Sequence, residues 1–171
     1  MIMIGSDHGG VELKDRLVGF LQTHRHEVRD VGTIGTESVD YPDYGRIVAR
    51  HVALGLAERG ILICTNGIGM SILANKFPGV RAALVADVIG ARMSREHLDA
   101  NILIMGGGFV GKFLACEIVK VWLHTDFAGG RHQRRLSKIA SIERELGLHE
   151  WVTRVNAGEV DERVVPPLVS T

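Results

Sequence analysis

Apolar residues along this chain alternate between short continuous runs and longer stretches with helical spacing. The continuous runs predict buried strands, because a strand covered on both faces needs no polar alternation. Five such strands are expected, at Met1–Gly5, Glu27–Val31, Gly60–Cys64, Val80–Val85 and Ile102–Met105. Between and after them, apolar residues recur three or four positions apart, which is typical of helices. These helices are expected within residues 13–21, 47–56, 68–76, 88–96, 110–124 and 136–146.

This order of elements predicts an α/β protein with a single doubly wound, five-stranded parallel sheet. Helices would cover both faces and give a Rossmann-like three-layer α/β/α arrangement with a C-terminal helix and tail. A chain of 171 residues suits one well-buried domain. We assign residues 1–147 to that domain and residues 148–171 to a C-terminal extension of unknown role. Periodicity is expected to end at Gly147, and Pro166-Pro167 disfavours a helix in the tail.

Composition narrows the classes of partner. Acidic and basic residues balance at 20 each, so charge favours neither nucleic acid nor a membrane surface. Both cysteines, Cys64 and Cys116, lie in apolar elements and are expected to be reduced thiols. The sequence has no secretory signal and no apolar run of membrane-spanning length, which favours a cytoplasmic protein.

The segment with the clearest chemistry runs from Ile61 to Ser71. A β-branched strand ends on Cys64, a loop with Gly67 and Gly69 follows, and a helical pattern then begins. Glycines let a backbone approach a ligand closely, and free N–H groups opening a helix favour negative charge. The same N–H groups would stabilise a thiolate. The alternative interpretation is that Cys64 is core filler, the commoner role of a buried cysteine.

Polar residues follow other predicted strands and converge on the same edge of the sheet. Asp7-His8 follows the first strand and Asp87 follows the fourth. Ligands of doubly wound sheets bind beyond the carboxyl ends of strands, so these loops could form one crevice with Cys64. His97 precedes the fifth strand and is expected at the opposite edge. It would therefore reach such a crevice only from a second subunit.

A basic run after two glycines, from Gly129 to Arg135, is a candidate phosphate site. Arg131 and Arg135 are four residues apart at the start of a helical pattern, so they share one helix face. Two guanidinium groups beside a helix N-terminus suit a phosphate. The alternative is a solvated basic turn.

Five motifs in unbroken order resemble the type B ribose-5-phosphate isomerase family, which includes the galactose-6-phosphate isomerase subunits. They are Gly5–Gly10, Asp40-Tyr41-Pro42, Ile63–Lys76, Ser94–His97 and Gly129–Gln133. The resemblance spans roughly residues 1–146. It implies an aldose–ketose isomerase of the cytoplasmic pentose phosphate pathway, acting through an enediolate. It also implies a homodimer or homotetramer with active sites shared between subunits, and neither a metal nor an organic cofactor.

The resemblance also implies roles for individual residues. Cys64 matches the base that removes the proton beside the carbonyl, and Asp7 with His97 matches the pair that opens the sugar ring. The remaining matches bind substrate: the loop residues hold the enediolate oxygen, and His8 and the two arginines contact phosphate. This binding set is His8, Tyr41, Thr65, Asn66, Gly67, Ile68, Gly69, Met70, Ser71, Asn101, Arg131 and Arg135.

Several positions depart from the family pattern. Leu98 stands where an Asn usually follows the catalytic His, and Gly108 stands where an Arg is usual. Thr65 and Asn66 occupy loop positions that are commonly Gly and Thr. The sugar is therefore open: ribose 5-phosphate leads, and other four- to six-carbon sugar phosphates are alternatives.

Two other classes of function are weighed against an isomerase. A non-catalytic sugar-phosphate-binding subunit of a hetero-oligomeric isomerase is disfavoured, because Cys64 and His97 are both present. A nucleotide-binding module of flavodoxin or Rossmann type is disfavoured, because no G-x-G-x-x-G follows the first strand.

Overall fold

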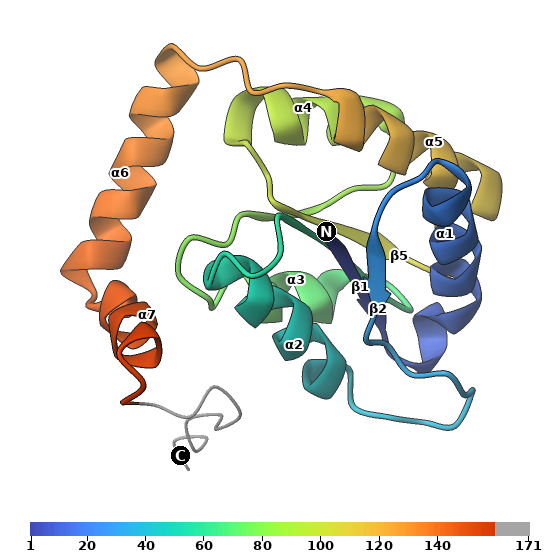
Figure 1. The fold of residues 1–171 in the computed structure, drawn as a ribbon. Coiled ribbons are helices and arrows are strands. Elements are labelled where there is room, and N and C mark those ends of the chain that lie inside the picture. The colour runs from blue at the N-terminus through green and yellow to red at the C-terminus, as the bar shows by residue number, and fades with distance from the viewer. Residues whose placement is uncertain (160–171) are drawn as a thin grey trace.

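A five-stranded, wholly parallel sheet forms the centre of the protein in the computed structural model, which describes residues 1–159 (Figure 1). The strands are β1 (Ile2–Ser6), β2 (Val28–Asp30), β3 (Arg59–Cys64), β4 (Ala82–Leu84) and β5 (Ile102–Gly106). Their order across the sheet is β2-β1-β3-β5-β4. The predicted sheet is confirmed. The two edge strands are only three residues long, shorter than predicted, because an edge strand pairs on one side alone.

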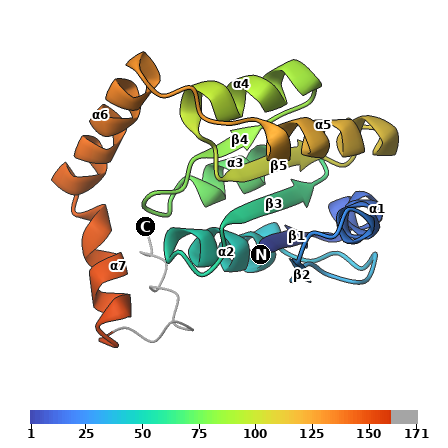
Figure 2. The same ribbon diagram turned by 45° about the horizontal axis from the view of Figure 1, so that its top comes forward.

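Helices cover both faces, which confirms the three-layer arrangement (Figure 2). They are the single-turn η1 (His8–Gly10), α1 (Val11–Thr23), α2 (Tyr41–Ala53), α3 (Ile68–Ala74), α4 (Val88–Leu98), α5 (Lys112–His124), α6 (Arg131–Glu145) and α7 (Leu148–Asn156). Residues of α1, α4 and α5 share one hydrophobic cluster with the sheet, and residues of α2 and α3 share the other. None of the helices described in residues 1–159 is both long and apolar enough for a membrane span.

Alternation along β3 assigns each side chain to one of these two clusters. Ile61 and Ile63 point to the cluster that includes α1 and α5. Leu62 and Cys64 point to the cluster that includes α2 and α3. Both faces are covered, so the strand reads as one continuous apolar run. The thiol of Cys64 therefore ends the strand on the α2–α3 side.

The strand order creates a switch point between β1 and β3. The connection from β1 leads outward to β2, whereas the chain beyond β3 builds the other half of the sheet. The loops that leave the carboxyl ends of β1 and β3 therefore lead to helices on opposite faces, and open α/β sheets bind their ligands at such a point. Asp7 and Cys64 lie at these two strand ends.

A buried lysine joins α1 to β2. Lys14 is 1% exposed, and its ammonium bonds to Asp30 at the end of β2 and to Asp15 at 2.8 Å. Burial lowers the pKa of Lys14, but the bonds to Asp15 and Asp30 outweigh that effect and leave the pKa above its usual 10.5. The pair fixes β2, a short edge strand, against the helix that precedes it.

The last two helices stand apart from the layered body (Figures 1 and 2). Helix α7 corrects the expectation that periodicity ends at Gly147. Leu148, Trp151, Val152 and Val155 recur at helical spacing, but the helix is only nine residues long and its signal is correspondingly weak. Pro166 and Pro167 lie outside the described residues.

Candidate active site

Cys64 ends β3 with its sulfur bonded into the following turn. The N–H of Gly67 donates a hydrogen bond to Sγ over 3.1 Å. The thiol also lies 4.0 Å from Oδ1 of Asn66, an oxygen that accepts the N–H of Ile68 at 2.9 Å. The residue is 5% exposed, so its sulfur is fixed in place rather than free on the surface.

Three loops meet around this sulfur. The carbonyl of Cys64 accepts the N–H of Gly107 at 2.8 Å, and the carbonyl of Thr65 accepts the N–H of Gly108 at 2.9 Å. The loop after β1 joins them at Gly9, where an added Cβ would lie 2.1 Å from Oγ1 of Thr65. The sequence pointed to the loop after β4 as a partner, but β5 is the neighbour of β3 and supplies the loop instead. Asp87 caps α4 by accepting the N–H of Gly90 at 2.7 Å.

The close approach at Gly9 explains one departure from the family pattern. Thr65 stands where that pattern commonly has glycine, and its side chain needs room. Gly9 has no side chain and leaves that room, because a Cβ there would overlap the threonine hydroxyl. The departure at position 65 is accommodated by the residue opposite it.

Asp7 and His8 line the same edge from the end of β1. Asp7 is buried and accepts the N–H of Gly9 at 3.0 Å. Burial raises the pKa of Asp7, against the opposing effects of His8 and the nearby N–H groups. His8 accepts the N–H of Val39 on Nδ1 at 3.1 Å, so its neutral ring has the proton on Nε2. Sequence reasoning missed Val39, because 31 positions separate it from His8.

Tyr41 covers the loop that follows Cys64. It is the first residue of α2, and a Cβ added at Gly69 would lie 2.7 Å from Cζ of its ring. Met70 is fully buried, so only its backbone faces the loop. Ile68 is exposed, and Ser71 is half-buried. The predicted loop residues from Thr65 to Ser71 and Tyr41 are thus brought together.

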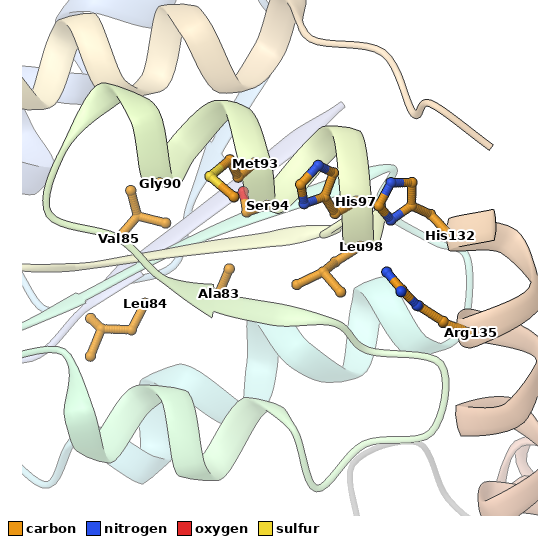
Figure 3. Close-up of a pocket in the computed structure, with 10 residues that line it drawn as sticks. All are labelled: Ala83, Leu84, Val85, Gly90, Met93, Ser94, His97, Leu98, His132 and Arg135. Carbon is orange, nitrogen blue, oxygen red and sulfur yellow. The ribbon is translucent and has the colours of Figure 1, made fainter. Parts of the chain in front are cut away.

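A second cluster of polar residues lies between α4 and α6. The ring of His97 stacks on that of His132 with centroids 4.2 Å apart and planes within 6°. Figure 3 shows the two rings side by side and Arg135 next to them, at a cavity of about 390 Å³ floored by β4. Burial lowers the pKa of His132, and positive charge on His97, Arg131 and Arg135 lowers it further. His132 was missed as a site residue, although it lies inside the basic motif.

The two clusters lie at opposite ends of the sheet. Helix α4 begins with its cap Asp87 at the carboxyl end of β4 and runs back to His97 near the start of β5. The structure therefore separates His97 from Cys64 within one chain. Asn101 stays at this far end, where its side chain bonds to the backbone of Gly79 at 2.9 Å and Arg81 at 2.8 Å. That side chain has a structural task and is not near the thiol.

Comparison with known proteins agrees with this geometry. A family model described as Ribose/Galactose Isomerase matches residues 2–139. Ribose-5-phosphate isomerase B of Escherichia coli is 46% identical over 142 residues, which is 83% of this chain and 95% of that protein. The structure of ribose-5-phosphate isomerase B from Clostridium thermocellum has a TM-score of 0.83 and 54% identity, covering 85% of this chain and 98% of that one. The structure of a ribose 5-phosphate isomerase from Thermotoga maritima has a TM-score of 0.80 and 46% identity. The match covers 82% of this chain and 97% of that one.

The fold, the thiol-bearing loop and these matches define an isomerase. The chain belongs to the ribose/galactose isomerase family. The matches give no support to a nucleotide-binding module or to a non-catalytic subunit. The family model ends at residue 139, before α6 ends and before α7 begins.

Proposed function

We propose that the protein interconverts the aldose and ketose forms of a sugar phosphate, with ribose 5-phosphate and ribulose 5-phosphate as the leading pair. The observation that carries the proposal is the bond from the Gly67 N–H to the sulfur of Cys64. It places a base beside a glycine loop able to stabilise an oxyanion. The reaction belongs to carbohydrate metabolism, and we assign it to the pentose phosphate pathway in the cytoplasm.

Proton transfer is assigned to Cys64. Its thiolate removes the proton from C2 of the open-chain aldose, and the electron pair moves to form the enediolate. Backbone N–H groups of the 67–71 loop stabilise the charge on oxygen, namely those of Gly69 and Met70, because the N–H groups of Gly67, Ile68 and Ser71 bond within the turn. The O2 proton passes to O1, and the proton held by the Cys64 thiol returns to C1, which gives the ketose with a hydroxyl on C1 and a carbonyl on C2. This sequence needs one base and an oxyanion site.

Ring opening and phosphate binding are assigned to the remaining residues. Asp7 and His97 exchange protons with the ring oxygen and the anomeric hydroxyl. His8, Arg131 and Arg135 bind the phosphate, and the Nε2–H of His8 is the donor left by its bond to Val39. Phosphate binding holds the sugar in the site and stabilises the ground state and the transition state alike.

A complete site requires two subunits. Cys64 lies at the carboxyl end of the sheet, whereas His97 and Arg135 lie at the other end of the same chain. We propose a homodimer or homotetramer in which one subunit supplies Cys64, Asp7 and His8. The other subunit supplies His97 and the arginines. Support comes from exposed apolar side chains around the β4 edge, namely Leu84, Ile89, Met93 and Leu98.

Two departures bear on the choice of sugar. Gly108 lies against the Thr65 carbonyl and offers no cation, and Leu98 offers no amide. A lost charge-assisted hydrogen bond is worth roughly 1.5–3 kcal/mol, or about ten- to a hundredfold in affinity. We propose that ribose 5-phosphate binds weakly, or that a sugar of another length leaves both positions unused.

The proposal is tested by a coupled isomerase assay across four-, five- and six-carbon aldose phosphates. Cys64→Ala should lose at least about a hundredfold in kcat, because the proton acceptor is gone. Cys116→Ala is the matched control, a buried thiol in α5 with no place in the reaction. Turnover retained in Cys64→Ala, or no turnover of any sugar phosphate by the parent, would overturn the proposal.

A further inference from the structure

Helix α6, which bears Arg131 and Arg135, is fixed to its own subunit mainly at its two ends. At the first end, His132 stacks on His97. At the second end, the carboxylate of Glu143 accepts the N–H of Gly79 at 3.1 and 3.2 Å. Gly79 lies in the turn between α3 and β4 and belongs to the layered body.

The middle of α6 is poorly packed. Cavities of about 390 and about 350 Å³ separate the helix from α4 and from the turn that contains Arg81. His132 is its only buried residue, and Ile139 and Ile142 are about half exposed. A helix without a packed middle takes its position from its ends.

Helix α7 reinforces the second end. Nε2 of His149 lies 3.2 Å from the Glu143 carboxylate. The ring of Trp151 packs edge-on against Phe77 at 5.8 Å between centroids, and the guanidinium of Arg50 lies 5.8 Å from the same ring. Trp151 thus joins α7 to both α2 and the α3–β4 turn. Such aromatic and cation–π contacts are specific in geometry.

We propose that α7 is a positioning element for phosphate binding, acting through the joint of Trp151 and Glu143. The joint sets the angle of α6 on the body and so the placement of Arg131 and Arg135. This inference rests on the proposed function, in which both arginines bind the phosphate of the substrate. Trp151 lies in the extension and Glu143 lies just beyond the segment that the family model matches, whereas their partners Gly79, Phe77 and Arg50 lie within that segment.

The proposal predicts a change in binding rather than in chemistry. Arg131 and Arg135 contact the non-reacting end of the sugar, so misplacing them weakens the ground state and transition state equally. Trp151→Ala in the full chain should raise KM roughly three- to tenfold with kcat unchanged. The inhibition constant of inorganic phosphate should rise by the same factor. Trp151→Phe keeps an aromatic ring and should restore both constants.

Two further variants separate this role from a loss of stability. Arg154→Ala is the matched control, because Arg154 is exposed on α7 and pairs with Glu159 of the same end of the chain at 3.7 Å. It should leave KM and phosphate inhibition at parental values. Glu143→Ala should raise both constants, and combining it with Trp151→Ala should add little, because both variants break one joint.

The outcomes are distinct from those of the proposed function. Trp151→Ala that melts earlier but keeps the parental KM and phosphate inhibition would overturn the inference while leaving the isomerase intact. If the parent isomerises no sugar phosphate, the proposed function fails. Calorimetric titration of inorganic phosphate then still tests the joint: parental affinity in Trp151→Ala overturns it, and weakened affinity supports it.

Discussion

The N–H of Gly67 points at the sulfur of Cys64 from 3.1 Å, and it does so because Gly67 has a left-handed backbone with φ of +78°. No side chain fits there. A Cβ on Gly67 would lie 2.4 Å from Cδ1 of Leu84 and 3.1 Å from the backbone carbon of Met105. The orientation of the thiol therefore depends on a residue that must be glycine for two separate reasons.

Gly67→Ala should reduce isomerase activity by at least roughly tenfold and stability by about 1–3 kcal/mol, because the turn must shift. Gly55→Ala is the matched control. Gly55 has a similar φ of +71°, but nothing lies within 4 Å of its added Cβ. It should share the backbone strain without the loss of activity. Steady-state kinetics and urea unfolding of both variants make the comparison, and equal activity losses would contradict it.

Mixing Cys64→Ala with His97→Ala subunits should restore activity. Each variant alone lacks one half of every site, whereas one site of a hybrid dimer has both halves. Random mixing makes about half of the dimers hybrids, so about a quarter of parental activity is expected. The measurement is activity after the two variants are unfolded and refolded together. Hybrids shown to form without recovering activity would place each site within one chain.

Asp7→Asn should stabilise the fold at neutral pH while lowering activity at least about tenfold. Burial raises the pKa of Asp7 above its usual 3.8, so the folded state keeps a proton that the unfolded state has released. The free energy of unfolding therefore falls as pH rises from the usual Asp pKa to the raised pKa of Asp7 in the folded state. Above the raised pKa, the full destabilisation by the buried carboxylate is present.

Melting temperatures of parent and Asp7→Asn, from about pH 3.5 to about pH 8, test the sign. The variant has no charge to bury, so its advantage should grow with pH and shrink toward the acid end. The amide oxygen can still accept the N–H of Gly9, which preserves the cap. An advantage that is constant with pH would rule out the carboxylate as its source.

Asp30→Asn should cost about 1–3 kcal/mol of stability, because it leaves the Lys14 ammonium buried with Asp15 alone. Asp15→Asn is the control, since Asp15 is 64% exposed and its loss should matter less. The Lys14 pKa is raised, so its contribution is complete below the usual 10.5 and is lost as pH rises through the folded value. In Asp30→Asn, the loss of stability at alkaline pH should begin at lower pH than in the parent, as measured by urea unfolding across the pH range. If the two proteins lose stability over the same alkaline range, the Lys14–Asp30 pair is not its source.

Local signals predicted much of this molecule. The buried strand ending on Cys64, and the glycine loop after it, followed from residues adjacent in sequence. The separation of His97 from Cys64 could also be predicted, because His97 lies at the end of the helix that leads into the fifth strand, whereas Cys64 ends the third strand. The lengths of the edge strands β2 and β4 were overestimated, because apolar residues continue past the last paired position of each strand. Helix α7 was missed because nine residues give a weak period.

Contacts between distant segments could not be predicted in the same way. The bond from Val39 to His8, and the stack of His132 on His97, join segments more than thirty residues apart. The loop after β5 replaced the loop after β4 beside Cys64 because of strand order, which the pattern of apolar residues does not encode. The bonds from the Asn101 side chain to Gly79 and Arg81 likewise could not be predicted, because these residues lie 22 and 20 positions away in the turn before β4.

Gly9 and Thr65 couple two loops that lie 56 positions apart in the sequence. A side chain at position 9 leaves no room for threonine at position 65, since the two groups would overlap. A substitution at position 9 is therefore tolerated only together with a smaller residue at position 65. A graft that transfers the loop after β3 to another protein of this fold must carry glycine at the position that faces its threonine.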